Sequence, residues 1–135
     1  MREILFRGKQ VGNGEWVEGN LITGKWYLDE REIVAIAPLD NAFYPHCEMS
    51  EWYEVDPATV GQYTGLTDKN GKKIFEGDIV EEYDIWGEFE RFGTVSWHDL
   101  FCAWHIGKPK AMYNSPVASY VVIGNIHDNR ELLEG

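Results

Sequence analysis

Residues 62–80 read QYTGLTDKNGKKIFEGDIV, and this stretch decides the fold class of the chain. Asn70 and Gly71 both tolerate a positive φ, and apolar residues stand on either side of them, so the pair predicts a β-hairpin. Its loop is either a two-residue primed turn or a longer turn that Gly71 closes in the left-handed region. We expect the Asp68 side chain to bond the backbone two residues further on.

A second bend follows the hairpin at residues 76–78. The Glu-Gly-Asp sequence interrupts the alternation before Ile79 and Val80, as a β-bulge does. Such a bend lets the chain enter the next strand at a new angle, which is how small curved barrels turn their corners. The stretch therefore predicts bent β-structure, and it contains no phosphate loop and no metal cluster.

Three segments together are similar to the YopX family, small proteins encoded by bacteriophages and prophages. The segments are residues 62–80, residues 1–7 (MREILFR) and residues 122–133 (VIGNIHDNRELL). The resemblance implies a phage or prophage origin and a C-terminal SH3-type barrel, and it carries over no catalytic residue. Two features depart from the family pattern: Gly8 and Lys9 stand where Ala-Trp is common, and residues 83–112 match no family motif.

Short apolar runs between turn residues predict strands along the rest of the chain. We expect them over residues 4–10, 15–22, 25–29, 32–38, 52–55, 79–83, 91–97, 101–106 and 118–123. The apolar run 33–37 predicts a strand buried on both faces, and residues 40–47 an irregular loop. Asp56 before Pro57 predicts a capped helical turn, and Asp128 with Glu131 predicts another.

These elements predict an all-β fold. We expect an N-terminal β-hairpin or sheet unit over residues 1–56 and a YopX-like, SH3-like barrel domain over residues 57–135, with one continuous fold as the alternative. The chain has 14 Gly and 5 Pro and no long helical periodicity, which favours short strands and turns.

The composition limits the classes of partner. Twelve Lys and Arg against 23 Asp and Glu give a formal net charge of -11, which disfavours nucleic acids and anionic membranes. The acidity either keeps an aromatic-rich protein in solution or offers a negative face, as a DNA mimic, to a basic host protein. No apolar stretch is long enough to span a membrane, so we expect the cytoplasm of a bacterial host cell, and we expect no cofactor.

Three groups of residues have side chains suited to chemistry. His46 and Cys47 with Cys102 and His105 are zinc-type ligands, although positions three apart on a strand face opposite sides. The acidic run over residues 76–84 offers carboxylates to a hard cation, or is a solvated edge strand. Residues 96–99 (SWHD) bring a hydroxyl, an imidazole and a carboxylate together, but triads are assembled from separated segments. We therefore predict no metal site and no catalytic residue.

Exposed aromatic side chains are the best candidates for function. Trp86 lies beside Gly87 in a predicted long, mobile loop over residues 84–88, and Phe43 and Tyr44 precede a proline. Aromatic residues of this kind, with few basic residues nearby, indicate protein contacts. We expect a non-enzymatic interaction or assembly module that forms homo-oligomers, with a host protein as a further partner. The rival interpretation is a metal-dependent enzyme built on the acidic run 76–84.

Overall fold

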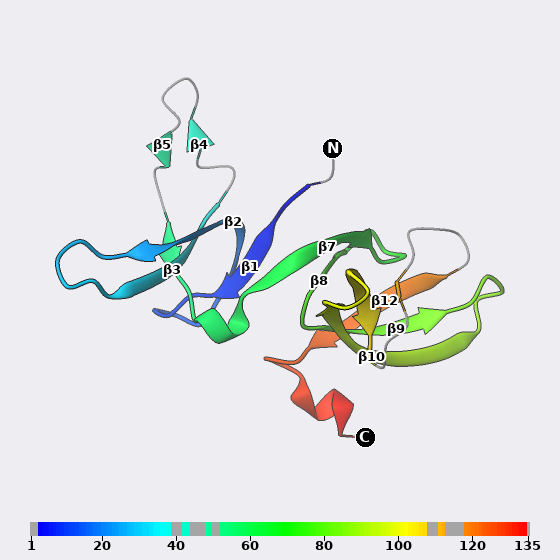
Figure 1. The fold of residues 1–135 in the computed structure, drawn as a ribbon. Helices are drawn as coiled ribbons and strands as arrows, with labels where there is room; N and C mark the ends of the chain where they lie inside the picture. Colours follow the sequence, from blue (N-terminus) through cyan, green and yellow to red (C-terminus); the bar gives the residue numbers. More distant parts are fainter. Residues whose placement is uncertain are drawn as a thin grey trace. The chain divides into compact units, whose positions relative to one another are not determined.

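The computed structural model describes residues 3–38, 42–43, 48–49, 52–107, 111–112 and 118–134. The protein is all-β, and its paired strands are antiparallel. Helical residues in the described ranges are confined to two short 3-10 turns, η2 (Pro57–Thr59) and η3 (Arg130–Leu133). Nowhere in these ranges does a helix have the length and apolar character needed to cross a membrane. The chain divides into two compact units, Met1–Gln62 and Tyr63–Gly135 (Figure 1).

The first unit is an antiparallel sheet in the order β6-β3-β2-β1. Its strands are β1 (Phe6–Lys9), β2 (Trp16–Lys25), β3 (Glu32–Ala37) and β6 (Tyr53–Glu54), and the first two residues of β7 (Gly61–Thr67) pair with β1. The predicted hairpin between the first two strands is confirmed. The predicted irregular loop contains β4 (Ala42–Phe43), which pairs with β5 (Glu48–Met49).

The strand predicted over residues 25–29 is wrong. β2 pairs with β3 without interruption as far as Lys25 opposite Glu32, so the chain must reverse between these two residues. It does so in a turn in which the Trp26 N–H donates to the Arg31 carbonyl at 2.8 Å and the Glu30 N–H donates to the Trp26 carbonyl at 2.8 Å.

The apolar run in β3 is buried on both faces, as predicted. Ala35 and Ile36 point to opposite sides of the sheet and are both 0% exposed. After β6, the Asp56 side chain accepts a hydrogen bond from the Ala58 N–H at 3.0 Å and Pro57 begins η2, which confirms the predicted capped turn. The capped turn thus leads directly from β6 into β7.

The second unit contains a four-stranded antiparallel sheet in the order β11-β10-β9-β12. The strands are β9 (Asp78–Tyr83), β10 (Phe89–His98), β11 (Ala103–Ile106) and β12 (Ser119–Asn125), and β8 (Lys73–Phe75) pairs with β7. Its core contains Ile74, Val80, Val95, Ile106 and Tyr120. Among the described strands no hydrogen-bonded ladder closes the four-stranded sheet on itself, so the architecture established is one of antiparallel sheets.

The hairpin within residues 62–80 takes the longer of the two predicted loops. Gly71 has φ 84° and donates its N–H to the Asp68 carbonyl at 3.0 Å. The Asp68 side chain accepts from the Asn70 N–H at 2.9 Å, which confirms the predicted bond two residues on. At the second bend Gly77 has φ 91°, and buried Asp78 accepts from the Phe75 N–H at 2.8 Å. The bend is a tight turn between β8 and β9.

The capping box predicted at the C-terminus is wrong in detail. The helical turn η3 forms, but its N-cap residue is Asn129, which makes no side-chain hydrogen bond to the turn. Asn129 Oδ1 instead accepts from the Asn125 N–H at 3.2 Å, and the Asp128 carboxylate accepts from the Asn125 side chain at 3.1 Å. Both side chains therefore stabilise the end of β12.

The predicted boundary after residue 56 lies a few residues before the division into compact units. Residues 57–62 contain η2 and the start of β7, and the division assigns them to the first unit. The two predicted domains, and the alternative of one continuous fold, stay predictions.

Candidate functional site

The turn between β9 and β10 presents Trp86 on a backbone held by hydrogen bonds. Asp84 Oδ1 accepts from the N–H groups of Trp86 and Glu88, both at 2.9 Å. The Asp84 N–H donates to the Glu88 carbonyl at 2.9 Å, and Gly87, with φ 81°, donates to the Asp84 carbonyl at 3.0 Å. The loop predicted to be long is therefore a short turn joining the two strands (Figure 1).

Large apolar side chains cluster in sequence around this turn and are exposed. Trp86 is 80% exposed and Ile85 57%, and Phe89, at 54%, lies edge-to-face against Tyr83 with ring centroids 6.0 Å apart. We call these four residues, Tyr83, Ile85, Trp86 and Phe89, the aromatic tip. Exposed aromatic residues on a fixed backbone are typical of protein contact sites.

The charges that the turn itself places beside the aromatic tip are acidic, whereas Lys69, from the hairpin turn before β8, lies with Nζ 5.4 Å from the centroid of the Tyr83 ring. The charged residues within positions 83–90 are Asp84, Glu88 and Glu90. The Tyr83 hydroxyl donates a hydrogen bond to Glu81 Oε1 at 3.0 Å, and this bond, with burial and the negative charge of Glu81, raises the pKa of Tyr83. The tip therefore joins apolar surface to negative charge.

The other two predicted contact residues are not placed by the structure. Phe43 is the second residue of β4, and nothing is described of its side chain. Tyr44 lies outside the described residues. Both stay predictions.

An apolar groove lies on the first unit. It has a volume of about 260 Å³ and is lined by Ile22, Gly24, Lys25, Trp26, Ile33 and Trp52. The register pairs Gly24 with Ile33 and Ile22 with Ala35, so these side chains share one face of the sheet. No atom lies within 4 Å of the position that a Cβ on Gly24 would take, so the missing side chain leaves open space. We call this feature the apolar groove.

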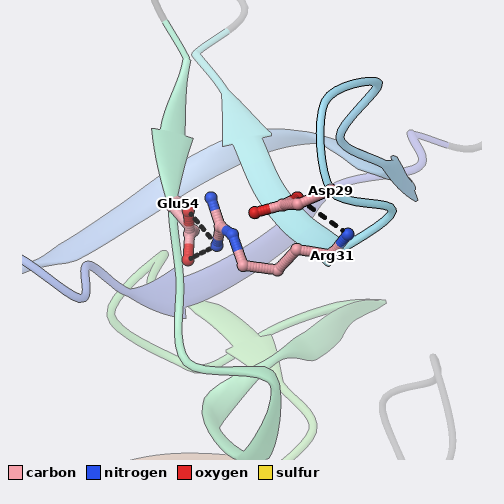
Figure 2. A network of polar contacts seen from close by, with 3 residues as sticks. All are labelled: Asp29, Arg31 and Glu54. Carbon is pink, nitrogen blue, oxygen red and sulfur yellow. Dashed lines mark hydrogen bonds and ion pairs between the residues drawn. The ribbon is translucent and has the colours of Figure 1, made fainter.

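An ion pair flanks the groove face of the sheet. Glu54 is paired with Ala35 across β6 and β3, which places it on the face that carries Ile22. Figure 2 shows the Arg31 guanidinium facing the Glu54 carboxylate, with Nη1 3.1 and 3.0 Å from the two carboxylate oxygens. Asp29 fixes the turn by accepting from the Arg31 N–H at 3.0 Å. Both side chains are partly exposed, so the ion pair contributes little to the stability of the fold. Its main effect is that the two opposite charges cancel on this face of the sheet.

The apolar groove was missed at the level of sequence. Ile22 and Gly24 alternate along β2, and Trp26 follows the end of that strand at the same spacing, which is the signal that the three positions share a face. The incorrect strand over residues 25–29 hid that signal, because it placed Trp26 in a separate strand instead of directly after the strand that contains Ile22. The pairing of β3 with β6, which brings the neighbourhood of Trp52 to the same face, has no local sequence signal.

The carboxylates of the acidic run have separate structural tasks. Asp78 is 1% exposed and caps the Phe75 N–H, and Glu82, 3% exposed, forms an ion pair with Arg91 at 3.4 Å. Asp84 holds the turn of the aromatic tip. The run is thus partly buried and not wholly a solvated edge.

The residues considered as zinc ligands, for which no metal site was predicted, are placed only in part. Cys102 is exposed in the turn after β10, and His105 is buried in β11 with neither ring nitrogen bonded to a described residue. Burial, with repulsion from His98 and Arg91, lowers the pKa of His105. His46 and Cys47 lie outside the described residues. Among the residues that are described, no group of three or more His, Cys, Asp or Glu side chains is arranged to hold a metal ion.

The SWHD segment does not form a triad in the structure. Ser96, Trp97 and His98 are consecutive residues of β10, so Ser96 and His98 share a face and Trp97 points to the other. His98 Nδ1 accepts from the Phe101 N–H at 3.4 Å, and its ring stacks on His105 with centroids 4.9 Å apart. The imidazole is therefore packed in the β10–β11 hairpin.

The family model described as YopX protein matches residues 5–134, nearly the whole chain, so the chain belongs to the YopX family. No curated protein matches it. The crystal structure of protein EF1440 from Enterococcus faecalis is similar, with 26% sequence identity, a TM-score of 0.61, and coverage of 98% of this chain and 99% of that one.

Proposed function

We propose that this YopX-family protein is a non-enzymatic interaction or assembly module of phage or prophage origin, and that the aromatic tip is its contact surface. One observation carries the proposal: Trp86 is 80% exposed on a turn whose backbone is held by Asp84. An aromatic side chain contributes most to binding when it enters a partner's pocket, and a prearranged backbone reduces the entropy lost on association.

The charge of the chain favours a basic partner. The net charge of -11 and the acidic residues at the tip complement a partner whose apolar pocket has a basic rim. A host protein met in the bacterial cytoplasm is one such partner. Homo-oligomers belong to the same proposal, but they would be held by apolar contacts, because each copy carries a net charge of -11. The same charge disfavours phosphate backbones, which supports protein recognition over nucleic-acid recognition.

An SH3-type barrel in the second unit is part of the same proposal. We propose this barrel because the bend at Gly77 redirects the chain between β8 and β9. Bends of this kind are how small sheets curve toward closure. The barrel would hold the β9–β10 turn as a projecting loop.

Replacement of Trp86 by alanine tests the contact surface. We expect the urea midpoint to stay unchanged, because the side chain is exposed, while affinity for a partner captured from host lysate falls at least about tenfold. Leu100→Ala is the matched control, because Leu100 is also 80% exposed but lies in the β10–β11 turn. Equal partner binding by the wild type and Trp86→Ala would show that the aromatic tip is not the contact surface.

A metal scan of the wild-type protein tests the enzyme alternative. A melting temperature that rises with Mg²⁺, Mn²⁺ or Zn²⁺ would favour a metal-dependent enzyme instead.

Replacement of Asp84 by alanine tests the fixed turn separately from the side chain it presents. Two N–H groups lose their acceptor, and we expect a loss of about 1 kcal/mol in unfolding free energy. Amide exchange at Trp86 and Glu88 should accelerate, and partner affinity should fall although Trp86 is present. Glu90→Ala on the same hairpin serves as the control and should change neither. Unaltered exchange in Asp84→Ala would show that Asp84 does not order the turn.

A further inference from the structure

We propose that the stacked rings of His98, Phe101 and His105 form a pH-sensitive switch in the β10–β11 hairpin, which is closed while His105 is neutral and opens when His105 takes up a proton. The inference is independent of the aromatic tip and of its partner. The centroid of the His98 ring lies 4.8 Å from that of Phe101 and 4.9 Å from that of His105. The Phe101 and His105 rings are nearly parallel, at 9°, with centroids 5.9 Å apart. We call these three residues the ring stack.

His105 occupies a position that suits a neutral imidazole and not a charged one. The residue is 4% exposed, and neither Nδ1 nor Nε2 has a hydrogen-bond partner among the described residues. Burial without an acceptor costs an imidazolium far more than a neutral ring, because the charged form depends on water or on a carboxylate. A proton on His105 therefore favours conformations in which the ring leaves the stack and reaches water.

The charged groups on the neighbouring strands oppose that proton. On β10 they are His98, in the ring stack, and Arg91, whose guanidinium donates to the Ile106 carbonyl at 2.8 Å. The carboxylate of Glu82 on β9 is already engaged, because it forms an ion pair with Arg91 at 3.4 Å. Burial, then His98, then Arg91 hold the pKa of His105 below its usual value of 6.5.

The other described residues that pair with His105 are uncharged. Ser96 stands opposite it on β10, and Ala111 forms a bridge with it from the other side of β11. Asp99, the acidic residue of the turn between the two strands, is exposed, so water screens its charge. The ring stack is therefore a titratable group in the core of a hairpin, without a carboxylate bonded to it.

The direction of the pH response follows from the lowered pKa of His105. Above the unfolded value of 6.5 the ring is neutral in both the folded and the unfolded state, and the ring stack contributes its full stability. As the pH falls below that value, the unfolded chain binds the proton more readily than the folded one. Stability is then lost until the pH reaches the folded pKa. The response begins at mildly acidic pH, above the range in which carboxylates titrate.

The place of the hairpin in the sheet allows it to open locally. β11 stands at one edge of the four-stranded sheet, whereas β9 and β12 are paired with each other at the other side. His98 Nδ1 accepts from the Phe101 N–H at 3.4 Å, and a protonated Nδ1 cannot accept this bond. We therefore expect β11 and its turn to open in acid before the rest of the sheet.

Amide hydrogen exchange measured by NMR tests the switch in the wild-type protein. The reporter is Gly107, directly after β11, whose N–H donates to the Thr94 carbonyl of β10 at 2.9 Å. The reference is Lys69, whose N–H donates at 2.9 Å to the Tyr120 carbonyl of β12, at the opposite edge of the sheet. Between about pH 7.5 and about pH 5, we expect the protection factor of Gly107 to fall at least about threefold more than that of Lys69.

Three variants assign the response to the ring stack. His105→Phe keeps a ring in the stack but cannot take up a proton, so the loss of protection at Gly107 should be absent. His98→Gln removes the neighbouring imidazole, so His105 should titrate at a higher pH and the loss should be smaller. His127→Gln is the matched control, because His127 follows β12 at the opposite edge of the sheet, and it should respond like the wild type. Circular dichroism at neutral pH confirms that each variant folds.

The imidazole resonances of the wild type test the inference without any variant. The ring of His105 should titrate at a lower pH in the folded protein than in the urea-unfolded chain. Titration at or above the unfolded value would overturn the inference. Equal loss of protection at Gly107 and Lys69 would do so too, since the opening would then be global, and so would a loss at Gly107 that persists in His105→Phe or disappears in His127→Gln.

Discussion

Replacement of Gly19 by alanine is expected to destabilise the first unit by about 3 kcal/mol or more. A Cβ at this position of β2 would lie 2.1 Å from the Ala37 carbonyl oxygen and 2.6 Å from its carbon. Both are backbone atoms near the end of β3, so no side-chain rotation relieves the overlap. Urea unfolding followed by circular dichroism measures the loss, and a markedly lower midpoint is the expected result.

Gly24→Ala provides a matched control in the same strand. Nothing lies within 4 Å of its Cβ position, and glycine is unfavourable inside a strand, so we expect stability to stay equal or rise by about 0.5 kcal/mol. The two substitutions have the same chemistry and differ in surroundings. If Gly19→Ala and Gly24→Ala were equally stable, the close approach of Ala37 to β2 would be wrong.

These two glycines also mark the limit of prediction from sequence. Gly19 stands within the strand predicted over residues 15–22 and Gly24 just after it, and no local pattern separates the glycine that is crowded by backbone from the one that opens a groove. The difference arises from the backbone of Ala37 and Pro38 at the end of β3 and from the pairing of β3 with β6, which are long-range features. Local signals were sufficient elsewhere: the turn closed by Gly71 and the Asp56 cap depend on neighbouring residues, and both were predicted.

The aromatic tip also combines a feature that was predicted from the sequence with one that was not. Exposure of Trp86 was expected from its position beside Gly87. The fixed geometry of its turn was not, because Asp84 was interpreted as a member of an acidic run. Its carboxylate is used by two N–H groups of the turn. Likewise Asp78 and Glu82, which alternate along β9, were interpreted as an exposed edge and are buried, since β9 lies between β10 and β12 in the sheet.

The largest effect in the second unit is expected for Asp68→Ala. The Asp68 carboxylate, 5% exposed, accepts from Asn70 and Lys72 at 2.9 Å each, and from Val122 at 3.1 Å. The first two bonds close the hairpin turn, and the third ties it to β12. Alanine leaves three N–H groups without this acceptor, so we expect a loss of about 3 kcal/mol. Asp99→Ala, an exposed carboxylate in the β10–β11 turn, should change stability by less than about 0.5 kcal/mol.

The ionisation of Asp68 gives this prediction a pH dependence. Burial by itself raises the pKa of Asp68, but the hydrogen bonds from Val122, Lys72 and Asn70, together with the charge of Lys72, outweigh it, and the pKa lies below its usual value of 3.8. Because the folded-state pKa is lower than the unfolded one, the ionised carboxylate stabilises the fold above the unfolded pKa. This contribution is lost as the pH falls through the folded pKa.

Asp68→Asn isolates that contribution from the other carboxylates of the chain. Asparagine has the same size but does not titrate, and its amide group places a donor where one oxygen accepted. The difference in unfolding free energy between the wild type and Asp68→Asn should be constant near neutral pH and should shrink as the pH falls below about 4. The remaining carboxylates titrate in both proteins and cancel in the difference. A difference that stays constant through acid pH would show that Asp68 is not held ionised by Val122, Lys72 and Asn70, and the turn would then owe its geometry to Gly71 alone.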